Sequence, residues 1–131
     1  LTVLENVALP GWRLHGSRRR AVDRARALID ELDLGPRADR RPHELSVGEL
    51  SRAAVARALS CDPAIVLADE PTANLDSDTA AHILDLLAKL NEETGTTFVF
   101  ATHDPAVMSR AHRVVRLRDG RIAEQEHALV A

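Results

Sequence analysis

Two adjacent carboxylates, Asp69 and Glu70, follow directly after an apolar run at positions 64–68. Like charges side by side at the edge of a core add no stability, whereas a divalent cation takes carboxylate oxygens as ligands. Because successive strand side chains point in opposite directions, one carboxylate can serve a metal while the next faces a water. That division suits nucleotide hydrolysis, with Asp69 holding Mg²⁺ and Glu70 activating water. On these residues alone, a loop-capping pair is an equally good interpretation.

A second group, Ser46, Gly48 and Glu49, has the composition of an anion site at the start of a helix. Free N–H groups and the helix dipole attract anions there, and glycine lets the backbone approach a ligand closely. His103, at the end of another apolar run, can donate to a phosphate oxygen. Each feature also has a plainer interpretation, namely an ordinary serine cap with an acidic first turn and a surface histidine.

The sequence around these residues predicts an α/β chain. Apolar spacing and flanking caps predict helices at 17–33, 48–60, 78–93 and 105–111, strands at 64–68 and 96–101, and a hairpin at 113–124. Pro10-Gly11 predicts a turn in an otherwise irregular start. The two strands read as buried on both faces of a parallel sheet. Ligands of such sheets bind beyond the carboxyl ends of the strands, where Asp69, Glu70 and His103 fall.

Composition narrows the class of protein. The 131 residues are 45% apolar and 28% charged, which predicts one soluble globular domain. A net charge of -3, no Tyr, two Phe and one Trp argue against nucleic-acid binding. The single cysteine, Cys61, fits a reducing compartment. No apolar run approaches the ~20 residues of a membrane span, so any membrane association is expected to come through a partner.

Four segments resemble, in order and spacing, the motifs of the nucleotide-binding domain of ABC transporters. They are LSVGE at Leu45–Glu49 (signature), IVLADE at Ile65–Glu70 (Walker B), ANLD at Ala73–Asp76 (D-loop) and ATHD at Ala101–Asp104 (H-loop). The resemblance covers nearly the whole chain, and the ordered set is far more specific than any one motif. The opening LTVLENVALP and the run LADEPTANLD look most like the subgroup that serves lipoprotein release and macrolide export.

The resemblance implies the C-terminal part of a P-loop NTPase (RecA-like) α/β sheet together with part of the family's helical subdomain. Residues 1–60 would form the helical subdomain and signature region, and residues 61–131 would carry Walker B, the D-loop, the H-loop and a closing hairpin. The implied function is that of an ATP-binding, ATP-hydrolysing subunit that energises a transporter. Its implied partners are a second such domain and transmembrane permease subunits, at the cytoplasmic face of the cell membrane.

The family's two domains close head to tail around two ATP molecules, which gives each motif residue an implied role. Ser46 and Gly48, with Glu49 in the same motif, would bind the γ-phosphate held by the partner. Asp69 would bind Mg²⁺ through water, and Glu70 would be the general base. Asp76 would couple the two sites at the interface, and His103 would sense the γ-phosphate. Val47 departs from the family's usual glycine, and as a β-branched residue it resists a positive φ and crowds a phosphate.

The largest departure is the missing phosphate-binding loop, Gly-x-x-x-x-Gly-Lys-Ser/Thr. Lys89 is the only lysine and lies in a predicted helix, while Gln125 is the only glutamine and lies far from where a Q-loop would be. We expect an N-terminally truncated chain that is inactive as an ATPase by itself. Without the central P-loop strand, the Walker B strand would have an unpaired apolar edge, which predicts low stability or aggregation.

Three other functions remain compatible with parts of the sequence. A non-catalytic remnant or regulatory module would also lack the phosphate-binding loop. A DNA-repair or chromosome-structure ATPase shares the signature and Walker B, but its long coiled-coil insertions are not seen here. An ABC protein that acts on ribosomes would normally carry two such domains in one chain.

Overall fold

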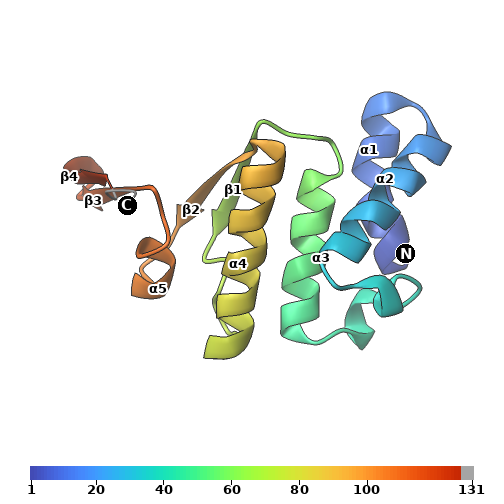
Figure 1. Cartoon of the computed structure of the whole chain (residues 1–131), viewed down its shortest axis with the longest axis horizontal. Coiled ribbons are helices and arrows are strands. Elements are labelled where there is room, and N and C mark those ends of the chain that lie inside the picture. The colour runs from blue at the N-terminus through green and yellow to red at the C-terminus, as the bar shows by residue number, and fades with distance from the viewer. Residues whose placement is uncertain (128–131) are drawn as a thin grey trace.

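The computed structural model describes residues 1–127 of the chain. Helices α1 (Val3–His15), α2 (Arg18–Glu31) and α3 (Val47–Leu59) pack against one another as a bundle, with short 3-10 helices at Gly35–Arg37 and Pro42–Glu44 between α2 and α3 in the chain. The second part consists of β1 (Ile65–Asp69), α4 (Ser77–Thr94), β2 (Thr97–Ala101), α5 (Pro105–Met108), β3 (Arg113–Arg118) and β4 (Arg121–His127). The first three helices lie at one end of the molecule and the β3–β4 hairpin at the other, with the β1–β2 pair and α4 between them (Figure 1).

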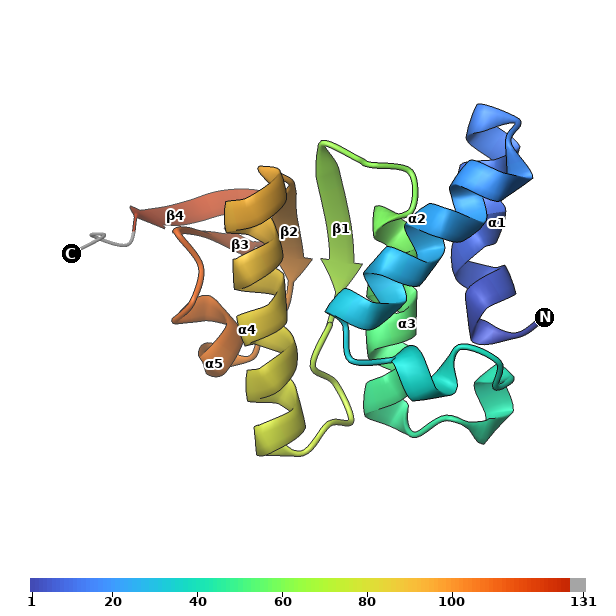
Figure 2. The ribbon, with the colours of Figure 1, turned by 45° about the vertical axis from the view of Figure 1, so that its right-hand side comes forward.

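The described strands form two small sheets. Strands β1 and β2 pair in parallel, with Ile65 opposite Thr97 and Asp69 opposite Ala101, and both point toward the same end of the molecule (Figure 2). Strands β3 and β4 form an antiparallel hairpin with an irregularity at Arg116/Leu117. The predicted parallel pair and hairpin are therefore confirmed, and the fold is mixed α/β as expected.

Local sequence fixes most helix ends. Ser17 caps α2 by accepting a hydrogen bond from the Arg20 backbone N–H at 3.4 Å. Gly95 ends α4 in the left-handed conformation at φ 70°. Both ends lie where the sequence predicts them, because a serine hydroxyl satisfies a free N–H and glycine tolerates positive φ. Helix α5 ends at Met108, earlier than predicted.

The main hydrophobic core lies among the first three helices, β1 and α4. Its buried members are Val3, Val7, Ala8, Ala21, Ala25, Leu28, Ile29, Leu32, Leu34, Ala56, Leu59, Val66 and Leu90. Only Val66 in this set comes from a strand, so the sheet is attached to the core through one face.

The predicted turn at Pro10-Gly11 is wrong, because both residues lie inside α1. The helix starts at a capping box between Thr2 and Glu5 and ends at Gly16, so Pro10 is held within a helix defined at both ends. A Cβ on Gly11 would lie 2.9 Å from the Ser60 carbonyl oxygen. Glycine here therefore serves close packing of α1 against the end of α3, which local sequence does not reveal.

The prediction that both strands are buried on two faces is also wrong. Val66 is 8% exposed, but Ile65 and Leu67 on the opposite face are 58% and 77% exposed, and Val99 is 49% exposed. Among residues 1–127, β2 is the only strand that pairs with β1, and this apolar face is open to solvent at Ile65 and Leu67, while Val99 also lines a hollow beside the β3–β4 hairpin. Ile65, Leu67 and Val99 are called the open face below.

Substitution of Leu67 by Lys should shift this chain from self-association toward the monomer, because it puts a charge on the open face beside the free edge of β1. Sedimentation velocity over a concentration series measures the shift. Leu14→Lys is the matched control, since Leu14 is 64% exposed on α1 and away from the sheet. A wild-type chain that stays monomeric and melts in one sharp transition would contradict this expectation.

Candidate functional site

The chain turns sharply where β1 ends. Glu70 has φ 47°, and its backbone N–H donates to the Ala101 carbonyl at 2.8 Å, so the backbone stays tied to β2 through the turn. Positive φ is unfavourable for a residue with a long side chain. Because Glu70 bonds to the last residue of β2, it lies beside the residues that follow β2.

The Glu70 carboxylate contacts two of those residues. His103 Nδ1 lies 2.6 Å from Glu70 Oε1, and the Thr102 hydroxyl donates to Oε2 at 3.0 Å. The His103 hydrogen bond, followed by that of Thr102, lowers the pKa of Glu70, and the same carboxylate raises the pKa of His103. Each of the two groups thus stabilises the charged form of the other. The His103 side chain is 91% exposed, so its Nε2 is open to a ligand.

A second layer of hydrogen bonds fixes this pair. The Asp104 backbone N–H donates to Thr102 Oγ1 at 3.0 Å, and the buried Thr72 donates its hydroxyl to Asp104 Oδ2 at 3.1 Å. Asp104 Oδ1 caps α5 by accepting from the Ala106 N–H at 2.9 Å. Sequence reasoning missed Thr72, Thr102 and Asp104 as site residues. An aspartate directly before Pro105 is a helix-cap signal that could have identified Asp104.

Asp69 is exposed at the end of β1, next to Glu70. Within residues 1–127 there is no group of three or more His, Cys, Asp or Glu side chains placed to hold a metal ion. Magnesium does not require such a cage, because it binds one or two carboxylates, waters and the phosphates of its substrate. An exposed carboxylate at the strand end therefore fits Mg²⁺ bound together with a nucleotide.

The start of α3 is closed by a reciprocal cap. Ser46 Oγ accepts from the Glu49 N–H at 3.2 Å, and Glu49 Oε2 accepts from the Ser46 N–H at 2.8 Å. The other oxygen, Glu49 Oε1, accepts from Arg37 Nε at 2.7 Å. The backbone hydrogen bond from Ser46, then the Arg37 side chain, lowers the pKa of Glu49. Both Glu49 oxygens are thus used within the chain, whereas the exposed Ser46 hydroxyl retains its hydrogen for a ligand.

Gly48 and Val47 differ from what the sequence suggests. Gly48 is buried, and a Cβ there would lie 2.6 Å from Thr79 Cγ2 on α4, so its missing side chain faces the chain's own interior. Val47 is the first residue of α3 and is not among the residues with positive φ, so the expected backbone strain is absent. Its side chain is 55% exposed. Any effect of Val47 on a ligand would therefore come from its bulk.

Asp76 caps α4 by accepting two hydrogen bonds from one residue. Asp76 Oδ1 accepts from the Thr79 N–H at 3.0 Å, and Oδ2 accepts from the Thr79 hydroxyl at 2.7 Å. The hydroxyl bond, then the backbone bond, lowers the pKa of Asp76. The predicted site residues therefore form two groups, one around Glu70 and one where α3 and α4 start, toward the same end of the molecule (Figure 2).

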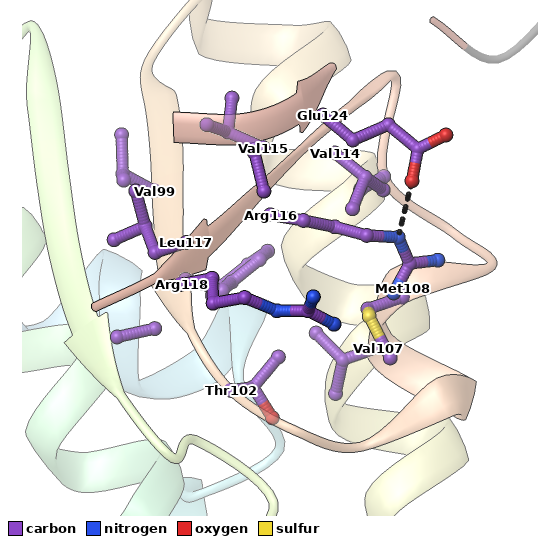
Figure 3. A pocket seen from close by; sticks show the side chains of 14 residues that line it. Val99, Thr102, Val107, Met108, Val114, Val115, Arg116, Leu117, Arg118 and Glu124 are labelled. Carbon is purple, nitrogen blue, oxygen red and sulfur yellow. Dashed lines mark ion pairs between the residues drawn. The ribbon is translucent and has the colours of Figure 1, made fainter. Parts of the chain in front are cut away.

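A hollow of about 930 Å³ lies between β2, α5 and the β3–β4 hairpin. Val99, Val107 and Leu117 contribute to its lining, and Arg116 Nε lies 3.7 Å from Glu124 Oε2 at its edge (Figure 3). None of the predicted site residues lines it. The hollow shares Val99 with the open face and Thr102 with the Glu70 group.

The sequence of this chain is similar to known proteins of one family. A family model described as ABC transporter matches residues 1–73, more than half of the 131. The lipoprotein-releasing system ATP-binding protein LolD 2 of Rhodospirillum rubrum is 47% identical over 97% of this chain and 55% of its own length. The macrolide export ATP-binding/permease protein MacB of Rhodopirellula baltica is 48% identical over 94% of this chain and 18% of its own length.

A solved structure extends the match to three dimensions. It is the dimeric, post-hydrolysis state of an ATP-binding cassette bound to ADP and Pi, with a TM-score of 0.78 and 40% identity over 97% of this chain and 56% of that one. The chain therefore belongs to the ABC transporter family, as part of an ATP-binding domain. It spans about half the length of LolD 2. Within the described residues, no helix has the length and apolar character needed to cross a membrane.

Substitution of Glu70 by Gln should lower the pKa of His103, because it removes the carboxylate that stabilises the imidazolium. With Glu70 present the ring keeps its proton to higher pH; without it the proton is lost at lower pH. Imidazole signals followed by NMR over a pH titration, with His103→Asn for assignment, measure the change. The signals of His15, on α1, should be the same in both proteins. An unchanged His103 titration would show that the pair does not form in solution.

Proposed function

We propose that this chain carries the Walker B, D-loop, H-loop and signature elements of an ATP-hydrolysing subunit that energises an ABC transporter. The observation that supports it most directly is the 2.6 Å contact between Glu70 and His103, next to the exposed Asp69 at the end of β1. An acid–base pair beside a free carboxylate is what hydrolysis of a phosphoanhydride requires. The likeness to LolD 2 and MacB supports a lipoprotein-release or macrolide-export type of system.

In this proposal Glu70 orients the attacking water and takes its proton. The hydrogen bonds from Thr102 and His103 hold the carboxylate in place, and its remaining lone pairs are free to accept from water. His103 donates from Nε2 to the γ-phosphate, where negative charge develops. Mg²⁺ held beside Asp69 would supply charge neutralisation between the phosphates.

The second group of residues serves the nucleotide of a partner domain. Ser46 offers its hydroxyl, and the free N–H groups at the start of α3 offer a positive dipole end to a γ-phosphate. Asp76 would lie at the interface between the two domains, and Glu49 supports Ser46 from within the chain. A related cassette was solved as a dimer with ADP and Pi, which supports this arrangement. Permease subunits would hold the assembly at the cytoplasmic face of the membrane.

A second candidate is a non-catalytic or regulatory module. The observation that favours it is the lack of Gly-x-x-x-x-Gly-Lys-Ser/Thr in these 131 residues. Under either proposal, residues 1–131 alone should show no ATP turnover, because they contain no loop to hold the phosphates.

In the complete ATP-binding subunit assembled with its permease, Glu70→Gln should lower ATP turnover by about 10²-fold or more while ATP still binds, because the base is lost and the shape is kept. A coupled phosphate-release assay and nucleotide binding measure the two effects. Glu92→Gln, on the exposed side of α4, is the matched control and should keep wild-type turnover. A wild-type assembly without turnover would favour the non-catalytic candidate.

Replacing Val47 by Gly should raise turnover roughly three-fold, because it removes an exposed side chain beside Ser46 that crowds the partner's γ-phosphate. Val47→Ala should give an intermediate gain, since it shortens the side chain without loosening the helix start. Steady-state ATPase rates of the three proteins test the order. Equal rates in all three would rule out the bulk of Val47 as a brake.

A further inference from the structure

The starts of α3 and α4 meet at one side chain, Thr79. Its methyl group points at Gly48, where a Cβ would come within 2.6 Å of Thr79 Cγ2. The α3 helix approaches α4 there because Gly48 has no side chain to fill the space. Figure 2 shows the two helix starts at the same end of the molecule.

Thr79 is held rigidly on its other side. Its N–H and its hydroxyl both donate to the Asp76 carboxylate, at 3.0 and 2.7 Å. A threonine whose hydroxyl is fixed has its χ1 fixed as well, so the direction of its methyl group is set by Asp76. A shift of Asp76 would therefore move the methyl group against Gly48.

A second contact ties α3 to the same loop region. The Ser51 hydroxyl donates to the Pro71 carbonyl at 3.4 Å, directly after Glu70 in the chain. The start of α3 is thus held at two points by the segment that runs from Glu70 to α4. Packed contacts of this kind resist continuous deformation, so displacement at one point is passed to the other.

From these contacts we infer that Thr79 is a positioning residue, which sets the place of Ser46 and Gly48 according to the position of Asp76 in the same chain. The inference rests on the proposed function, in which Ser46 serves the partner's nucleotide and Asp76 lies at the interface. Through Thr79, a change at the interface that moves Asp76 also moves the groups that bind the partner's γ-phosphate. The requirement for glycine at position 48 then comes from Thr79 and not from the nucleotide.

A pair of substitutions separates these two reasons for glycine. In the complete assembled transporter, Gly48→Ala should lower kcat for ATP about ten-fold and leave KM unchanged, because misplaced groups cost rate while the Walker side still binds ATP. Thr79→Ser keeps the hydroxyl and removes the methyl group, and alone should cost about three-fold. The double variant Gly48→Ala, Thr79→Ser should return to within about three-fold of wild type, because the added methyl group fills the vacated space.

Two further variants serve as a control for the position of the threonine and as a separate test of its hydroxyl. Gly48→Ala with Thr94→Ser, at the far end of α4, should stay as slow as Gly48→Ala alone. Thr79→Val keeps the shape but loses the hydroxyl bond to Asp76, and should lower kcat about five-fold even if Gly48→Ala fails to fold.

The outcomes distinguish the inference from the function on which it rests. Rescue by Thr79→Ser, without rescue by Thr94→Ser, would support the inference. An active wild type in which the double variant is no faster than Gly48→Ala, or in which Thr79→Val has wild-type kcat, would overturn the inference alone. A wild type without ATP turnover would overturn the proposed function and the inference with it.

Discussion

The in-register parallel pairing of β1 with β2 determines where every group around Glu70 lies. Asp69 is opposite Ala101, so the residue after each strand emerges at the same edge, and the Glu70 N–H continues the ladder by bonding to Ala101. A register slip of one residue would turn the side chains to the other face and separate Glu70 from His103. Asp104 then holds this edge in place, because one of its oxygens caps α5 and the other accepts a hydrogen bond from the Thr72 hydroxyl.

Local signals in the sequence were sufficient for α2, α3 and α4, for the strands and for the parallel pair, but not for α1 or for the end of α5. Ser17, Ser46 and Gly95 act within one turn of helix, so their neighbours in sequence determine what they do. The turn wrongly predicted at Pro10-Gly11 has a different origin. Position 11 has no room for a side chain, because the Ser60 carbonyl oxygen, far along the chain, packs against it. The spacing of apolar residues and the amino-acid composition carry no information on such a contact.

In the candidate site, too, the sequence predicted the residues that local structure places and not the contacts with distant parts of the chain. Glu70 and His103 could be found because strand ends of a parallel sheet converge, whereas the use of both Glu49 oxygens depends on Arg37, twelve residues earlier. The burial of Gly48 against Thr79 and the exposure of Leu67 were likewise hidden, since both depend on which elements pack together. Family resemblance supplied motif roles but not these contacts within the chain.

The left-handed backbone at Glu70 has a consequence for how this position varies. Among residues 1–127, the other non-glycine residues with positive φ are Asp33, Asp62, Asn74 and Asp119. Their short polar side chains tolerate that conformation, and glutamate lacks this advantage. Selection of random variants for folded protein alone would therefore favour asparagine or glycine at position 70. A glutamate at this position indicates a requirement other than folding.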